Sequence, residues 1–245
     1  MKCNSLALLF FTCFFAGVII SGCGFKTEES QPETLVIKKC EDFRITGDGS
    51  SPEWGNSKWI DLQKQGKVIS PYYTKVKVLY SETGIYFLFD CEDTRLSATM
   101  MADNLNLWEE DVVEIFLWPD ESFPVYFEYE LSPLNYELPI IIPNKNGTFL
   151  GWLPWNYDGD KRTIHATSVT GGQKESGSTI TGWKAEFFIP YKLLAPLVQE
   201  APAPGTRWRA NMYRIDYDNG AGHFAWQKTD GSFHQYDKFG AFIFE

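Results

Sequence analysis

The stretch LWEEDVVEIFLW, residues 107–118, carries the pattern that decides the fold. Side chains of a β-strand alternate between its two faces. One predicted face is aliphatic, as in a hydrophobic core, and carries Val113, Ile115 and Leu117. The opposite face places a carboxyl among large apolar side chains and carries Val112, Glu114, Phe116 and Trp118. The pattern therefore predicts a strand with one face in the core and a second face rich in rings.

The next segment, VYFEYEL at residues 125–131, repeats this alternation after a turn-forming stretch. If the two segments pair as a hairpin, Tyr126, Glu128 and Glu130 lie on the same face as Glu114. Acids beside aromatic rings suit a sugar, because the acids hydrogen-bond to hydroxyl groups and the rings stack on C–H faces. A face that simply meets water would rarely carry so many large rings.

Most of the remaining chain also has strand character. Short segments rich in β-branched and aromatic residues are separated by turn residues and lie at 76–80, 85–90, 138–142, 164–169, 183–189, 208–217 and 239–244. Only residues 191–197, after Pro190, favour a helix. Many short strands with turns between them predict an all-β fold, an antiparallel β-sandwich with one short helix.

The N-terminal residues 1–22 are expected to be a lipoprotein signal peptide. Lys2 precedes an apolar run at 6–20, and the run is shorter than the roughly 20 residues of a membrane-spanning helix. The following ISGC resembles a bacterial lipobox, which implies that Cys23 is acylated and becomes the first residue. An ordinary signal peptide with an incidental cysteine is the alternative.

Residues 23–37 are expected to form a lipidated, flexible tether before a sandwich at 38–245. The stretch GFKTEESQPET is polar with almost nothing to bury. It resembles the acidic stretch after the lipidated cysteine in surface-exposed lipoproteins of the Bacteroidetes type. These features predict a protein of the cell envelope, anchored by lipid to the outer membrane and either periplasmic or surface-exposed.

The charge of the chain argues against two classes of partner. The full sequence has a net charge of −10, and removal of residues 1–22 takes away one lysine and no acid, leaving −11. Such an acidic chain is not expected to offer a basic surface that binds phosphate groups, so the charge argues against nucleic acid as a partner. It would not adhere to an anionic membrane by charge either, so attachment to a membrane requires the lipid anchor.

Two cysteines, Cys40 and Cys91, remain beyond the predicted lipidation site. They either form a disulfide or stay as two buried thiols. The three histidines, His165, His223 and His234, are scattered and show no zinc-ligand spacing with them.

Several segments, taken in order, resemble carbohydrate-binding module family 9. The central ones are LWEEDVVEIFLWPD at 107–120 and YFEYELSP at 126–133. The others are ITGDGSSPEWGNSKWIDL at 45–62, GWKAEFFIPYKLL at 182–194, RWRANMYRID at 207–216 and AWQKTDGSFHQYDKFGAFIF at 225–244. The resemblance spans residues 36–245 and implies a non-catalytic β-sandwich that binds glycan between two tryptophans.

The resemblance also implies roles for individual residues. Trp108 matches the first stacking tryptophan, and Glu114 matches the carboxylate that binds hydroxyls. Trp226 is the candidate for the second stacking ring, and Arg209 and Asn211 match polar positions of the sugar site. The alternative roles are core packing for the tryptophans and ion pairing for the polar residues.

Further features of the family are matched only in part. Trp155 and Glu128 are candidates for rim contacts. The family's arginine in the middle of the domain has no equivalent near Ser132 to Glu137. Family members bind structural calcium, but no dense ligand loop is present in this sequence, so no metal residue is assigned.

Three other functions compete with glycan binding. A glycoside hydrolase would need two carboxyls about 5 to 10 Å apart, and Glu114 with Glu128 could supply them. A haem-binding sandwich would use methionine and histidine as axial ligands. A sandwich that contacts only another protein is the third. A glycoside hydrolase or a transporter is expected as a partner.

Overall fold

The alternating segment of residues 112–118 forms strand β6 (Val112–Trp118), which pairs antiparallel with β7 (Val125–Leu131). In this register Glu114 lies opposite Glu130, and Phe116 lies opposite Glu128. The computed structural model describes residues 33–145, 148–155 and 157–245. The predicted signal peptide and the predicted lipidation site Cys23 lie outside the described residues.

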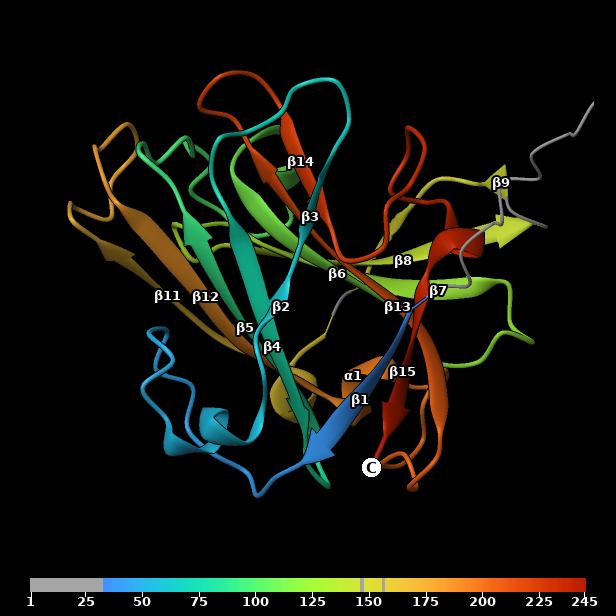
Figure 1. The fold of residues 1–245 in the computed structure, drawn as a ribbon. Coiled ribbons are helices and arrows are strands. Elements are labelled where there is room, and N and C mark those ends of the chain that lie inside the picture. Colours follow the sequence, from blue (N-terminus) through green and yellow to red (C-terminus); the bar gives the residue numbers. More distant parts are fainter. Residues whose placement is uncertain (1–32, 146–147, 156) are drawn as a thin grey trace, which may run out of the picture. The chain divides into compact units, whose positions relative to one another are not determined.

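The described strands form two sheets, shown in Figure 1. Sheet A contains β6 and β7, and its other strands are β3 (Gln63–Gln65), β8 (Glu137–Lys145), β9 (Thr148–Phe149), β10 (Leu153–Pro154), β13 (Arg207–Asp216), β14 (Gly222–Ala225) and β15 (Gly240–Phe244). Sheet B contains β2 (Ile60–Asp61), β4 (Thr74–Tyr80), β5 (Gly84–Glu92), β11 (Ile164–Thr170) and β12 (Gly182–Pro190). Strand β1 (Thr34–Lys39) joins the two sheets.

The predicted antiparallel β-sandwich with one short helix is confirmed. The single described α-helix is α1 (Tyr191–Leu194), directly after Pro190, which suits the start of a helix. Short 3-10 helices lie in the connections: η1 (Pro52–Asn56), η2 (Leu107–Glu109), η3 (Gly159–Lys161) and η4 (Tyr236–Lys238). The antiparallel pairing has one local exception, because β1 runs parallel to both β15 and β4.

Strand β1 corrects the predicted boundary of the tether. Residues 34–37 pair with β15, with Thr34 opposite Ala241 and Ile37 opposite Phe244, so they belong to the sandwich. The segment resembles a tether in sequence because only Ile37 is fully buried. Backbone hydrogen bonds to two neighbouring strands compensate for this weak apolar pattern.

The main core lies between the sheets. Val113, Ile115 and Leu117 of β6 are fully buried there, as the alternation predicts. Sheet B contributes stacked rings, including Phe87 and Phe187, whose centroids are 5.2 Å apart. Burial of each such ring stabilises the fold by roughly 1.5–3 kcal/mol. The second face of β6 contributes to a separate hydrophobic cluster on the outer side of sheet A.

The two remaining cysteines are free thiols. Cys91 is buried in the core between the sheets, and Cys40 is half-buried with its Sγ 3.3 Å from the carbonyl oxygen of Tyr80. Burial raises the pKa of each thiol to about 12, so neither is a reactive thiolate at neutral pH. The described structure thus contains no disulfide between them, and of the two thiols only Cys91 is fully buried.

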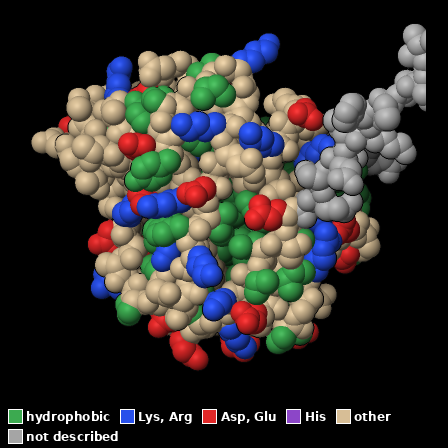
Figure 2. Space-filling view, viewed as in Figure 1, with side chains coloured by type: hydrophobic (Ala, Val, Ile, Leu, Met, Phe, Trp, Pro, Cys, Tyr) green, Lys and Arg blue, Asp and Glu red, His purple; other side chains and the backbone are tan. Residues whose placement is uncertain are grey.

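The exposed surface has mixed character. On the face shown in Figure 2, basic and acidic side chains are interspersed among hydrophobic ones. Within the described residues, no helix combines the length and the apolar character needed to cross a membrane.

Candidate functional site

A pocket of about 370 Å³ opens on the outer face of sheet A. Its floor comes from β6, β7, β8 and β13, and its walls come from η2, the segment around β9 and the loop after β14. This volume lies at the lower end of the range of small-molecule sites, which are lined mainly by apolar and aromatic groups with a few polar ones. The pocket has this composition, with two carboxyls at its floor.

Trp108 forms part of the wall. It lies in η2, one turn before β6, and its backbone carbonyl accepts a hydrogen bond of 2.8 Å from the hydroxyl of Tyr217. Its ring meets that of Trp152 edge to face, with centroids 5.6 Å apart and an interplanar angle of 71°. The indole of Trp108 is half-buried and lines the pocket, so it is available to a ligand.

Glu114 and Glu128 lie at the floor. Both line the pocket, and their exposed fractions are 2% and 4%. Glu130 lies directly across from Glu114 on β7 and is fully buried. Residues directly opposite on antiparallel strands have Cβ atoms about 4.5–5.5 Å apart. Three carboxyl groups are thus gathered on one small area of sheet A.

Burial raises the pKa of all three carboxyls. The pKa of Glu128 rises to about 8, and those of Glu114 and Glu130 also rise well above their ordinary value. The charge of Glu128 adds to the effect of burial at Glu114, and the charges of Glu114 and Glu128 add to it at Glu130. The empty pocket therefore favours neutral, protonated carboxyls near neutral pH.

Aromatic and histidine side chains complete the walls. Phe149 stacks on His234, with centroids 4.2 Å apart, and Phe233 stacks on Tyr213 at 4.1 Å. The hydroxyl of Tyr126 lies 2.8 Å from Nδ1 of His234. Burial lowers the pKa of His234 to about 4, so this imidazole is neutral at neutral pH. His223, whose pKa is also lowered by burial, lines the same pocket.

Trp226 does not line this pocket, which corrects its predicted role as the second stacking ring. Its side chain is 1% exposed and lies in the core between the sheets, 5.5 Å from the ring of Phe242. A ring enclosed in this way packs the core and cannot stack on a ligand. The available rings at the pocket are instead Trp152, Phe149 and Phe233.

Arg209 and Asn211 share the outer face of sheet A but are covered by the C-terminal loop. Arg209 donates hydrogen bonds to the backbone carbonyls of Tyr236, Asp237 and Phe239. Asn211 is fully buried; it donates to the carbonyl of Gln227 and accepts from the amide of the same residue. Both side chains therefore hold the loop in place, and neither lines the pocket.

Of the two predicted rim residues, only Glu128 lines the pocket. Trp155 donates a 2.8 Å hydrogen bond to the carbonyl of Leu193 and lines a different hollow of about 140 Å³ with Glu137. Trp152, three residues earlier, occupies the wall instead. The spacing of rings in this Gly- and Pro-rich segment gave no periodic signal that separates the two tryptophans.

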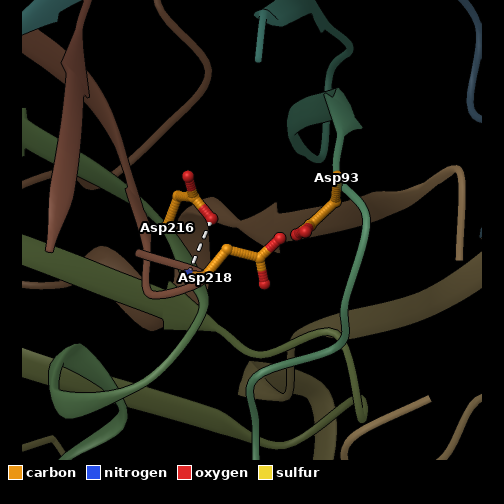
Figure 3. Close-up of side chains that lie close together, drawn as sticks. All are labelled: Asp93, Asp216 and Asp218. Carbon is orange, nitrogen blue, oxygen red and sulfur yellow. Dashed lines mark hydrogen bonds between the residues drawn. The ribbon is translucent and has the colours of Figure 1, made fainter. Parts of the chain in front are cut away.

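A second group of acids lies at the end of the sandwich near the β13–β14 turn. Figure 3 shows Asp216 and Asp218 on one segment and Asp93 approaching from another. One oxygen of each lies within 4.8 Å of the others. Carboxylate oxygens are the ligand type that calcium prefers, so the group fits a calcium ion in donor chemistry.

The same acids are already bonded within the protein. Asp93 accepts a 2.8 Å hydrogen bond from Arg214, and Asp218 accepts hydrogen bonds from the hydroxyls of Tyr72 and Thr94. Burial raises the pKa of Asp93 to about 6. Burial also acts to raise the pKa of Asp218, but hydrogen bonds from hydroxyl groups lower it overall. The group has a structural role with or without a metal ion.

Comparison with solved structures supports the fold. A protein from Bacteroides uniformis, provisionally described as carbohydrate-binding, has a TM-score of 0.71 and 16% identity, covering 88% of this chain and 100% of its own. A carbohydrate-binding module of family 9 from Caldicellulosiruptor kristjanssonii was solved with cellotriose, at a TM-score of 0.61 and 14% identity, covering 87% of this chain and 94% of its own. The structure of a family 9 module from the same organism with glucose has a TM-score of 0.63 and 15% identity, covering 87% and 96%.

No curated protein matches the sequence significantly. A family model, described as carbohydrate family 9 binding domain-like, matches residues 45–244, which is most of the chain and nearly the whole sandwich. The chain therefore belongs to the carbohydrate family 9 binding domain-like family.

Proposed function

We propose that this sandwich binds carbohydrate, without catalysis, in the pocket on the outer face of sheet A. The observation that carries the proposal is the half-buried indole of Trp108 beside the carboxyls of Glu114 and Glu128 in one pocket. Rings offer apolar faces to the C–H groups of a sugar, and the carboxyls can donate or accept hydrogen bonds with hydroxyl groups. The glucose and cellotriose bound by the solved family 9 modules support this class of ligand.

The rings that would contact the sugar together with Trp108 come from the segment around β9 and from the loop after β14. Trp152 contacts Trp108 directly, and Phe149 and Phe233 line the same pocket. Each ring that stacks on the ligand contributes about 1–3 kcal/mol, by analogy with base stacking. Ordering and desolvation on binding consume part of this energy, so we expect modest affinity.

Replacement of Trp108 tests the proposal. Binding of the wild-type protein to a panel of soluble glycans would be measured by titration calorimetry, and Trp108→Ala should lower affinity about tenfold or more. Trp59→Ala is the matched control, because Trp59 is 38% exposed, carries cation–π contacts from Lys75 and Lys77, and does not line the pocket. Both variants should melt at similar temperatures. Retention of full affinity by Trp108→Ala would overturn the proposal.

The electrostatics of the pocket support binding rather than hydrolysis. A glycosidase needs one ionised and one protonated carboxyl in unequal environments. Glu114 and Glu128 are both buried, and burial raises the pKa of both, which favours two neutral carboxyls. We therefore expect no release of product from any glycan that the protein binds. A hydrolytic activity that Glu114→Gln abolishes would contradict this expectation.

We further propose that the protein reaches the cell envelope as a lipoprotein. The support is the sequence of residues 1–23, with its apolar run and the lipobox-like ISGC ending at Cys23. Cys23→Ser should prevent incorporation of labelled fatty acid and release the protein from the membrane fraction. A glycoside hydrolase or a transporter in the same envelope would be the partner that uses the bound glycan, and co-purification after cross-linking would test this association.

A further inference from the structure

The carboxyls below the pocket lack counter-charges. Oε2 of Glu128 and both side-chain oxygens of Glu130 are buried without a basic or hydroxyl side chain as hydrogen-bond partner among the described residues, and the two carboxyls interact with each other instead. No lysine or arginine from the described part of the chain lines the pocket. Buried polar groups are nearly always paired in native proteins, so an unpaired cluster of this kind calls for an explanation.

The histidines of the pocket do not supply the missing positive charge. Nδ1 of His234 is 3.9 Å from Oε2 of Glu128, but burial lowers the pKa of His234 to about 4. His223 is also shifted toward its neutral form by burial. Other titratable groups packed near the acids are the phenols of Tyr126, Tyr213 and Tyr217, whose pKa values burial raises. Every group around the acids is therefore acidic or neutral.

The walls of the pocket also suit a cation. The faces of aromatic rings attract positive charge, and the attraction increases when the site is desolvated. Trp108, Trp152, Phe149 and Phe233 surround a space that has carboxyls at its floor. A neutral sugar can exchange hydrogen bonds with the protonated carboxyls, whereas an ammonium group would also stabilise their ionised form.

We propose that this pocket selects a sugar with a free amine. The ammonium group of the sugar binds beside Glu114 and Glu128, and the sugar ring stacks against Trp108. This inference rests on the proposed function of carbohydrate binding and specifies its ligand class. When the ammonium arrives, a carboxyl in the pocket gives up its proton to the buffer, so one proton is released for each ion pair formed. The pocket shields this ion pair from water, and a charge-assisted hydrogen bond is stronger in such a low-dielectric environment than in water.

Titration calorimetry with matched sugars tests the inference. Glucosamine would be compared with glucose and N-acetylglucosamine, and fully deacetylated chitobiose with cellobiose and diacetylchitobiose. At about pH 6 the amine is charged. We expect the free-amine sugars to bind about tenfold tighter than their neutral counterparts, which corresponds to about 1.4 kcal/mol. Titration in buffers of different ionisation enthalpy should detect proton release with the amine only.

Variants identify the groups that recognise the amine. Glu128→Gln and Glu114→Gln should reduce the tenfold preference to nearly none, measured as the ratio of amino-sugar to neutral-sugar affinity within each variant. The ratio is the readout because both carboxyls also contact sugar hydroxyls in the proposed function, so the affinity for neutral sugars is expected to change as well. Both replacements put an amide of nearly the same shape in place of a buried acid, so folding should be preserved, and melting curves would verify it. Glu200→Gln removes an exposed acid outside the pocket and should keep the full preference.

The possible outcomes separate the two proposals. Neutral sugars that bind as tightly as amino sugars would overturn the amine preference and leave carbohydrate binding intact. An amine preference that persists in both glutamine variants would also overturn the assigned site. A folded protein that binds no sugar of any kind would overturn both the inference and the function on which it rests.

Discussion

At the scale of single residues, the acids of the pocket couple stability to pH. Burial raises the pKa of Glu128 from its ordinary value of 4.5 to about 8. At a pH between these two values the folded protein keeps a proton on Glu128 that the unfolded chain has released. The stabilising effect of this proton is complete at low pH and disappears as the pH rises through about 8. Glu114 and Glu130 act in the same direction.

We therefore expect Glu128→Gln to be less sensitive to high pH than the wild type. The free energy of unfolding would be measured with urea between about pH 6.5 and 8, because both states have released the proton above the raised pKa of about 8. In this range the wild-type protein should lose roughly 1 kcal/mol per pH unit for each retained proton, and the variant should lose less. His234 titrates with its pKa lowered to about 4, below this range, so it does not disturb the comparison. Parallel slopes for the two proteins would contradict the prediction.

Residue patterns predicted the faces correctly but not what covers them. Alternation places Arg209 and Asn211 on the same outer face of sheet A as Phe116, and the register confirms it. The loop after β14 then covers both residues, through contacts between positions 16 to 30 residues apart that no periodicity reveals. Trp226 was misassigned for a related reason, because its polar sequence neighbours conceal a side chain that points into the core.

At the scale of elements, strong alternation fixed strand positions well. The predicted segments 112–118 and 125–131 coincide with β6 and β7, because each places apolar side chains on one face and rings or acids on the other. β1 was missed because only one of its residues is fully buried, and its stability depends on pairing with distant strands. Weak local patterns of this kind cannot identify a strand that long-range hydrogen bonds hold in place.

Truncation at the N-terminus tests the role of β1. A chain that begins at Pro32 should retain the full melting temperature, because β1 remains paired with β15 and β4. A chain that begins at Cys40 should melt lower and aggregate, because removal of β1 exposes the edges of both sheets. Thermal unfolding and light scattering would distinguish the two. Equal stability of the two chains would show that β1 adds nothing to the fold and that residues 34–37 belong to the predicted tether.

At the scale of the whole molecule, a buried ion pair fastens the two sheets together. Arg214 lies on β13 of sheet A, and its guanidinium is fully buried. It donates to the carbonyl of Glu92 at 2.7 Å and to the hydroxyl of Thr74 at 3.1 Å, both on sheet B. It also pairs with Asp93 at 2.8 Å. Arg214 therefore connects the two sheets through non-covalent contacts.

Loss of one partner from this pair should destabilise the entire sandwich. Arg214→Met leaves Asp93 buried beside Asp218 without its cation, and removal of one partner from a buried ion pair costs about 3–5 kcal/mol. Asp93→Asn should cost less, because an amide oxygen can still accept a hydrogen bond from Arg214. The double variant should be less destabilised than the sum of the two single variants, since it leaves no unpaired charge in the core.

Urea unfolding of the four proteins in a double-mutant cycle would measure this coupling. The pair is fully buried, so the coupling energy should change little between low and high salt, unlike that of an exposed ion pair. The exposed pair of Arg207 with Glu121 provides the comparison, and it should contribute at most about 1 kcal/mol. Strictly additive costs for Arg214 and Asp93 would mean that the sheets are held by apolar packing alone, and that the ion pair contributes nothing specific to their docking.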